Sequence, residues 1–318
     1  MTLITPTRRQ IIAGLPLAGL AATTAARAAE PDLAFLAVGD WGRDGASHQR
    51  EVAAEMGRTA TEIGSRFVVS VGDNFYEDGV KSAQDPQWKS SFEDIYVHPA
   101  LQAPWHALLG NHDYRGVPQA QIDYAATSPR WRMPSRYYKV AGTSLGAPQV
   151  DLFMLDTSPL VHRYRDKVDA PIARNVATQD VAAQLAWLDA ELARSQAPWK
   201  LVFGHHTIYS GGSEHGNTVE LVDQVRPILE RHGVQAYING HEHDLQHLRV
   251  AGVNYICAGA GSEVRPTAKI DGTLFCLARS GFAALRLDRD TLRLEFRDYQ
   301  GARVYAAAIS RTGALTGA

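Results

Sequence analysis

Cysteine is scarce in this sequence, which contains only Cys257 and Cys276 among its 318 residues. A fold stabilised by several disulfides is therefore excluded. Both cysteines lie in apolar segments typical of β-strands. Either a single bridge or two buried thiols is consistent with such positions, and the sequence leaves both alternatives open.

A large excess of either charge is also missing, because 32 Lys and Arg residues face 34 Asp and Glu residues, for a net charge of −2. This balance gives no electrostatic reason to expect nucleic acid as a partner. Internal repeats and low-complexity segments are absent, and nothing in the sequence indicates a protein partner. The composition, with 45% hydrophobic and 21% charged residues, fits one large α/β domain or two modest domains.

Long apolar runs are missing too. The candidate at residues 11–22 is too short for a membrane span and is interrupted by Gly14, Pro16 and Gly19. It follows the arginine pair 8–9 and precedes small residues at 26–28, at a spacing that signal peptidase accepts. We expect residues 1–28 to be a twin-arginine-like secretory signal and residues 29–318 to be the catalytic domain. The mature protein would be periplasmic or secreted, without stable membrane anchoring; a disordered basic N-terminus is the alternative.

What the sequence does contain is a repeated arrangement in which a short apolar run ends at glycine and a side chain able to bind a metal. The side chains that follow these glycines are Asp40, Asp73, Asn111 with His112, His205 and His241. Continuous apolar runs predict strands buried on both faces, and helical patterns at 178–194 and 219–231 lie between them. This order predicts a largely parallel, layered α/β fold, whose ligands gather at the carboxyl ends of the strands. After about residue 254, short alternating segments predict antiparallel strands that close the same domain.

Four motifs carry a resemblance to a known family, and a looser fifth accompanies them. They are Gly-Asp-Trp-Gly at 39–42, Gly-Asp-Asn-Phe-Tyr at 72–76, Gly-Asn-His-Asp at 110–113, Gly-His-Glu-His at 240–243, and Gly-His-His at 204–206. In this order they resemble the metallophosphoesterase signature. Tyr76, three residues after Asp73, narrows the resemblance to purple acid phosphatases, and to the small, animal-type, tartrate-resistant members over roughly residues 33–310. The resemblance implies a two-sheet α/β sandwich flanked by helices, with a single catalytic domain and a dimetal centre at the sheet edge.

The same resemblance implies seven metal ligands. A ferric ion would be bound by Asp40, Tyr76 and His243, a divalent ion by Asn111, His205 and His241, and Asp73 would bridge the two. The divalent ion would be Fe(II), Zn or Mn. These residue types suit the assignment, since ferric iron is a hard cation that prefers anionic oxygen, whereas neutral imidazole and amide groups suit a divalent ion.

The activity that the resemblance implies is a dimetal acid phosphatase that hydrolyses small phosphate monoesters and releases inorganic phosphate. A metal-bound hydroxide would attack the phosphorus without a phosphoenzyme intermediate. His112 beside Asp113, and His215, are candidates to bind the phosphoryl oxygens and to protonate the leaving alkoxide. An imidazolium is protonated at acidic pH, which would explain an acid optimum.

Three departures from the family pattern bear on specificity. His206 stands where the animal-type enzymes have tyrosine, Thr207 where they have proline, and Asp244 where asparagine is common. We expect the first two to affect leaving-group preference rather than the metal site. The polar segment 157–176 is either a loop near the substrate pocket or a solvated connector. Two other functions compete: a phosphodiesterase or nucleotidase with two divalent ions and no ferric tyrosinate, and a metal-holding binding or redox protein.

Overall fold

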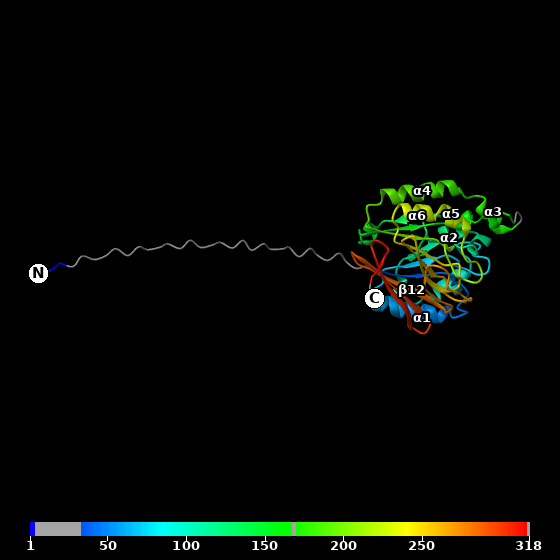
Figure 1. Ribbon diagram of the computed structural model, residues 1–318. Helices are drawn as coiled ribbons and strands as arrows, with labels where there is room; N and C mark the ends of the chain where they lie inside the picture. Colours follow the sequence, from blue (N-terminus) through cyan, green and yellow to red (C-terminus); the bar gives the residue numbers. More distant parts are fainter. Residues whose placement is uncertain (4–32, 167–169, 317–318) are drawn as a thin grey trace.

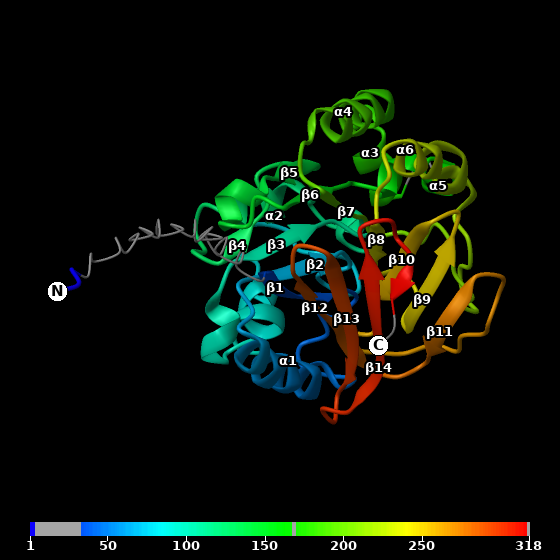
Figure 2. The same ribbon diagram turned by 60° about the vertical axis from the view of Figure 1, so that its left-hand side comes forward.

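Two mixed β-sheets lie face to face between layers of helices (Figures 1 and 2). The computed structural model describes residues 1–3, 33–166 and 170–316. Apart from its first three residues, the secretory signal expected over 1–28 lies outside the described residues. The two-sheet sandwich implied by the resemblance is confirmed.

Sheet A contains eight strands in the order β15-β14-β13-β12-β1-β2-β3-β4. Its strands are β1 (Leu33–Val38), β2 (Val68–Val71), β3 (Trp105–Leu108), β4 (Trp131–Arg132), β12 (Gly281–Leu287), β13 (Thr291–Asp298), β14 (Arg303–Ser310) and β15 (Leu315–Thr316). Strands β1 to β4 are parallel, and β12 pairs antiparallel with β1 and leads into an antiparallel meander. The antiparallel strands predicted near the C-terminus are therefore present and complete this sheet.

Sheet B contains seven strands in the order β11-β9-β10-β8-β7-β6-β5. Its strands are β5 (Tyr138–Val140), β6 (Val150–Met154), β7 (Trp199–Phe203), β8 (Ala236–Asn239), β9 (Leu245–Val250), β10 (Val253–Ala258) and β11 (Thr273–Leu277). The central strands β6, β7, β8 and β10 are parallel. Both sheets thus contain parallel strands, and the loops that follow the carboxyl ends of these strands can come together.

Helices cover the outer faces of the two sheets. Helix α1 (Gln49–Ile63) lies against sheet A, and the layer that contains α4 (Val181–Arg194) lies on the opposite side of the molecule (Figure 1). The remaining α-helices are α2 (Gln119–Tyr124), α3 (Pro171–Val176), α5 (Val219–Gln224) and α6 (Arg226–Arg231). The Asp180 side chain accepts a hydrogen bond from the Ala183 amide at 2.9 Å, so α4 begins three residues later than the predicted 178.

The single helix predicted over residues 219–231 is wrong in one respect, because the chain forms two short helices there. They are separated at Val225, and Pro227 lies in the first turn of α6. Proline has no amide hydrogen to continue the helical ladder, which explains the break. Gly233 follows the helix with φ of 60°, a left-handed conformation that glycine adopts without strain.

Aromatic side chains join the two sheets and support the loops above them. The rings of Phe35 on β1 and Phe203 on β7 lie 6.3 Å apart between the sheets, and both are fully buried. Trp41 and Phe75 are also fully buried, with ring centroids 5.4 Å apart. These two aromatic residues pack beneath the loops that carry Asp40 and Asp73 rather than facing solvent.

The two cysteines lie on different strands of sheet B and are both free thiols. Cys257 on β10 and Cys276 on β11 are each opposite Gln246 of the intervening strand β9. Two inter-strand spacings separate them by about 10 Å. This separation exceeds the range of a disulfide, so the alternative of two thiols holds.

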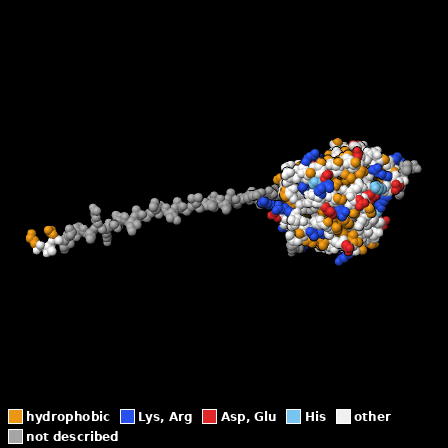
Figure 3. All heavy atoms as spheres, turned by 45° about the horizontal axis from the view of Figure 1, so that its top comes forward, with side chains coloured by type: hydrophobic (Ala, Val, Ile, Leu, Met, Phe, Trp, Pro, Cys, Tyr) orange, Lys and Arg blue, Asp and Glu red, His pale blue; other side chains and the backbone are white. Residues whose placement is uncertain are grey.

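None of the helices in the described part of the chain is both long and apolar enough to cross a membrane. On the face drawn in Figure 3, basic and acidic side chains are interspersed among apolar ones. This mixture agrees with the net charge of −2.

Candidate metal centre

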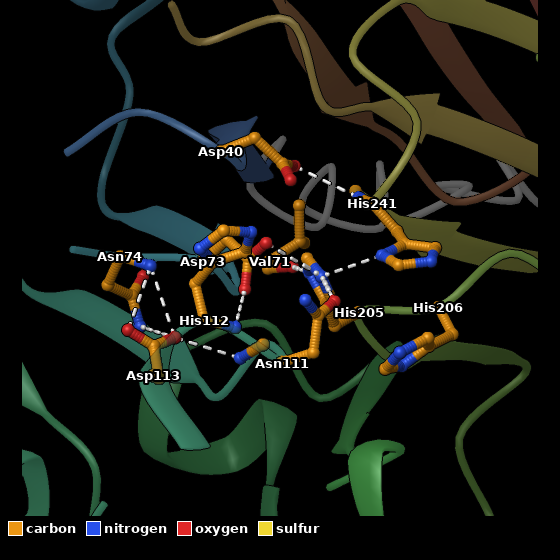
Figure 4. Close-up of polar contacts among 12 residues, drawn as sticks. Asp40, Val71, Asp73, Asn74, Asn111, His112, Asp113, His205, His206 and His241 are labelled. Atoms are coloured by element: carbon orange, nitrogen blue, oxygen red, sulfur yellow. Dashed lines mark hydrogen bonds and ion pairs between the residues drawn. The ribbon is translucent and has the colours of Figure 1, made fainter. Parts of the chain in front are cut away.

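Loops that follow parallel strands of both sheets bring all seven expected ligands into one buried site. Figure 4 labels five of them: Asp40, Asp73, Asn111, His205 and His241. Asp40 follows β1, Asp73 and Tyr76 follow β2, Asn111 follows β3, His205 follows β7, and His241 and His243 follow β8. The least buried of them, Tyr76, is only 8% exposed. The predicted convergence at the carboxyl ends of the strands is therefore observed.

The backbone adopts an unfavourable conformation at three of these residues. Asp40, Asp73 and His241 have φ angles of 59°, 49° and 72°. Each such residue costs on the order of 1–3 kcal/mol and persists only where the surroundings impose it, which happens most often at functional sites. The strain therefore marks the same loops that carry the metal-binding side chains.

Glycines in the motifs allow the loops to approach one another. A Cβ atom on Gly110 would lie 2.1 Å from Oδ1 of Asp73, and one on Gly240 would lie 2.3 Å from Oδ2 of Asp40. Any side chain at these positions would displace the carboxylates. The repeated Gly-Asp, Gly-Asn and Gly-His pairs in the sequence thus have a steric cause.

One cluster of ligand atoms surrounds the Tyr76 hydroxyl. Its oxygen lies 3.1 Å from Asp40 Oδ1, 3.1 Å from Asp73 Oδ2 and 3.0 Å from His243 Nε2. A phenol has only one hydrogen to donate, so it cannot satisfy both carboxylates. A cation among these atoms would satisfy all of them, and two carboxylates with a phenolate form the donor set that a hard trivalent ion prefers.

A second cluster surrounds Nε2 of His205. This nitrogen lies 3.2 Å from Asn111 Oδ1, 3.2 Å from His241 Nδ1 and 3.3 Å from Asp73 Oδ2. The other ring nitrogen, Nδ1, lies 3.0 Å from the Val71 carbonyl, which can only accept a hydrogen bond. That contact assigns the proton to Nδ1 and leaves the Nε2 lone pair facing the cluster.

Asp73 belongs to both clusters, because Oδ2 faces Tyr76 and His205. Its other oxygen accepts a hydrogen bond from the His112 amide at 2.8 Å. Burial alone would raise the pKa of Asp73, but the neighbouring His205 and His112 lower it well below its usual range. Asp73 is therefore the carboxylate that the two clusters share.

Electrostatics in the site favour a cation. Burial acts to lower the pKa of His205, but the carboxylates of Asp73 and Asp40 raise it to about 9. Burial and the same two carboxylates raise the pKa of Tyr76 well above its ordinary value, so its phenol stays neutral unless positive charge is added. Bound metal ions would supply that charge and displace the proton from His205.

His206 also lies near the site, and its ring could group with those of His205 and His241 around an ion. However, both of its nitrogens are already engaged, with Thr157 Oγ1 and Tyr164 Oη each at 2.8 Å. Burial and the adjacent His205 lower the pKa of His206 well below its usual value. The geometry therefore favours His205 over His206 as the residue that faces the carboxylates.

Two of the three expected catalytic residues border the clusters. The His112 ring lies 4.4 Å from the Tyr76 ring, and the His215 ring stacks on the His241 ring at 4.0 Å. Burial, together with Arg163 and Arg265, lowers the pKa of His215 to about 4. This lowered pKa opposes the protonated form that is expected of His215 at acidic pH.

Asp113 has a different role from the one expected. It is 1% exposed, and its carboxylate accepts hydrogen bonds from the amides of Gly110 at 2.8 Å and Asn74 at 3.1 Å. Gln121 donates a further bond at 2.7 Å. The carboxylate thus joins the loops that present the metal-binding residues, so we interpret Asp113 as a positioning residue.

Several residues at the site were missed by the sequence analysis. Tyr164 contacts His206, and Arg163 lies 3.4 Å from His241 Nε2, so part of the segment 157–176 reaches the site instead of forming a solvated connector. Glu242 accepts hydrogen bonds from the His215 and Gly216 amides. The only sequence feature that could have identified Glu242 was its position between two predicted metal ligands. The only such feature of the segment 157–176 was its polarity.

Comparisons with known proteins agree with this geometry. The profile of the calcineurin-like phosphoesterase family matches residues 33–245. Purple acid phosphatase 7 of Arabidopsis thaliana is 39% identical over 292 residues, which cover 89% of this chain and 87% of the relative. Tartrate-resistant acid phosphatase type 5 of Homo sapiens is 39% identical over 264 residues, which cover 80% of each chain.

Solved structures show the same fold. GAP50, described as the anchor in the inner membrane complex of Plasmodium, superposes with a TM-score of 0.75 at 24% identity and covers 88% of this chain and 89% of its own. The purple acid phosphatase PPD1 from yellow lupin (Lupinus luteus) seeds gives a TM-score of 0.64 at 14% identity, over 88% of this chain and 54% of its own. At these identities the likeness concerns the fold alone.

Proposed function

The chain belongs to the purple acid phosphatases within the calcineurin-like phosphoesterase family, and on this premise we propose that it hydrolyses phosphate monoesters with water, without a phosphoenzyme intermediate. The family makes the protein an acid phosphatase with a dimetal centre. The observation that carries the proposal is the pair of buried ligand clusters that share Asp73. Inorganic phosphate would be the product.

The two clusters suit two different ions. We assign a ferric ion to Asp40, Tyr76 and His243, and a divalent ion, Fe(II), Zn or Mn, to Asn111, His205 and His241, with Asp73 between them. Together with Asp73, the first set supplies two carboxylates and a phenolate, and the second set supplies neutral imidazole and amide donors. When bound, the ions would lower the pKa of water to about 7 or below and offset negative charge on the phosphoryl oxygens.

Side chains at the rim of the site would bind the phosphoryl group and donate a proton to the leaving alkoxide. His112 Nδ1 lies 2.6 Å from the Glu77 carbonyl, so Nδ1 carries hydrogen and Nε2 is free to meet the substrate. The Glu77 carboxylate, 3.7 Å from the same nitrogen, would stabilise a protonated ring. His112 is therefore the better proton donor for the leaving alkoxide, and a neutral His215 would donate a hydrogen bond to a phosphoryl oxygen.

Activity is tested by phosphate release from p-nitrophenyl phosphate at pH 5. His241→Ala should abolish turnover, whereas His162→Ala, which removes an exposed histidine outside the site, should not. Equal turnover in wild type and His241→Ala would overturn the proposed site. A phosphate ester made chiral with sulfur and oxygen isotopes tests direct attack by water, which inverts the phosphorus, whereas a phosphoenzyme gives retention.

The metal assignment is tested by elemental analysis and a visible spectrum of the purified protein. A ferric tyrosinate absorbs visible light, and Tyr76→Phe should remove that absorption. A colourless wild-type protein that is fully active with two divalent ions would instead support the phosphodiesterase or nucleotidase alternative. Activity without any metal would contradict the whole assignment.

We also propose that residues 1–28 direct export and that the mature protein acts in the periplasm or outside the cell. Support comes from the arginine pair 8–9 and the small residues 26–28. Replacing both arginines with lysine should leave unprocessed protein in the cytoplasm, as measured by cell fractionation. Equal export of the two forms would contradict a twin-arginine signal.

A further inference from the structure

A pocket lies beside the loops of the candidate metal centre. It has a volume of about 680 Å³, and its lining includes Lys81, Arg115, Tyr164 and Arg174. One acidic residue, Asp78, also lines it, so its charged side chains comprise three cations and one anion. The pocket is thus positively charged.

Two elements connect this pocket to the catalytic residues. Tyr164 lines the pocket while its hydroxyl lies 2.8 Å from His206, whose ring centroid is 4.3 Å from that of His241. Tyr164 therefore contacts a histidine beside the metal centre and also lines the pocket. The 3-10 turn Asp113–Arg115, which directly follows His112, forms the second connection.

Two of the three pocket cations, Lys81 and Arg115, are available to a ligand. Lys81 and Arg115 are both exposed, and neither forms an ion pair with any residue in the described ranges of the chain. Gly116, which also lines the pocket, fits tightly, since a Cβ atom there would lie 2.5 Å from the Asp78 carbonyl. The turn that carries Arg115 is therefore held firmly against residues 78–80.

We propose that this pocket is a leaving-group subsite that selects phosphate monoesters bearing a second anionic group, either a carboxylate or another phosphate. The proposal rests on the proposed function, because the phosphoryl group must occupy the metal centre for the rest of the substrate to extend past Tyr164. Lys81 and Arg115 would then pair with the second anion, and Arg174 would add to the positive potential. An uncharged leaving group would gain nothing from these residues.

The test compares substrates that differ only in charge. The 3- and 4-carboxyphenyl phosphates carry a second anion, and the matching carbamoylphenyl phosphates have the same shape without it. In low salt, wild type should show a kcat/KM roughly three- to tenfold higher for the carboxylates, mainly through KM, since partly exposed ion pairs contribute modestly. Half-molar salt should remove most of that preference.

Substitutions of the pocket cations test whether the preference for carboxylate substrates depends on the pocket. Arg115→Gln and Lys81→Gln should each reduce the ratio, and the double variant should bring it close to one while the carbamoyl substrates react as before. Arg293→Gln, which removes the same charge from β13, is the matched control and should leave the ratio unchanged. A wild-type ratio of one, or a ratio that survives the double variant, would overturn the subsite. If wild type hydrolyses none of these esters, the result contradicts both the proposed function and the subsite that depends on it.

Discussion

The guanidinium carbon of Arg43 lies 3.9 Å from the centre of the Tyr76 ring. Glu77 at 2.8 Å and Glu263 at 3.0 Å hold the guanidinium in this position, and the Arg43 side chain is only 14% exposed. A cation over an aromatic face attracts the ring electrons. Arg43 also acts to lower the pKa of Tyr76, against the stronger effects of burial and the Asp40 and Asp73 carboxylates.

Replacing Arg43 should therefore change the colour of the iron-loaded protein. Removing the cation raises the energy of the phenolate electrons, so the charge-transfer band should move to longer wavelength in Arg43→Gln. Arg43→Lys keeps the charge and should shift the band less. Visible absorption at equal iron content measures the effect, and an identical band in all three proteins would show that Arg43 does not act on Tyr76.

Asp113→Asn should weaken metal binding by about 10- to 100-fold, a range typical of residues that orient metal ligands. The reason is that an amide nitrogen would replace one of the oxygens that accept hydrogen bonds from the Gly110 and Asn74 amides. Metal content after dialysis against a chelator is the measurement. Asp123→Asn, on the exposed side of α2, is the control, and equal metal retention in the two variants would contradict the positioning role.

Glu242→Ala should reduce kcat by between about 10- and 100-fold without loss of metal, because small displacements of a catalytic group have effects of this size. The Glu242 carboxylate accepts hydrogen bonds from the His215 amide at 2.8 Å and the Gly216 amide at 2.7 Å. Glu242→Gln retains an acceptor oxygen and should recover much of the activity.

A double variant separates this role from a general structural one. If Glu242 acts by placing His215, Glu242→Ala combined with His215→Ala should be no slower than His215→Ala alone. Fully additive losses in kcat would show that Glu242 acts through something other than His215. Metal analysis of each variant shows whether the lower kcat instead comes from loss of metal bound by His241 and His243.

The sequence allowed the strands and the metal-binding positions to be predicted because both depend on local patterns. An apolar run buried on both faces, followed by glycine and Asp40 or His205, specifies the strand and the loop at its end together. The break in the helix at Val225 was missed although Pro227 is a local signal, because the apolar periodicity continues through it.

Contacts between distant segments could not be predicted in the same way. Arg43 reaches Tyr76 and Glu263, and Arg163 reaches His241, only after several loops have assembled. The lowered pKa of His215 depends on burial, on Arg163 and on Arg265, which is 50 residues away in the sequence. Residue type and spacing indicate candidate metal ligands. The protonation of the histidines and the contacts that hold the ligands in place depend on the complete site.

Asp156 gives a last prediction, on the pH dependence of stability. Its carboxyl is 1% exposed, Tyr114 donates a hydrogen bond to Oδ2, and Oδ1 has no partner among the residues that the structure describes. Burial raises the pKa of Asp156 to about 7, although Arg136 and Tyr114 act to lower it. At acidic pH the folded protein therefore keeps this carboxyl protonated.

The sign follows from proton linkage. Between pH 4 and 7 the native state binds this proton and the unfolded state does not, so the contribution to stability is complete below about pH 4 and is lost as pH rises through 7. The loss could reach about 4 kcal/mol, at 1.36 kcal/mol for each unit of pKa shift. Asp156→Asn cannot titrate, so its free energy of unfolding should fall less than that of wild type over this range.

Urea denaturation of the metal-loaded proteins at pH 4, 5.5, 7 and 8 measures this difference. Because both proteins carry the same metal centre, its own pH dependence largely cancels in the comparison. Asp290→Asn, at a surface position, should follow the wild-type curve. Parallel curves for wild type and Asp156→Asn would show that Asp156 is already ionised in the folded protein between pH 4 and 7, and would contradict the prediction. Diverging curves would show that the folded protein holds a proton on Asp156 in this range.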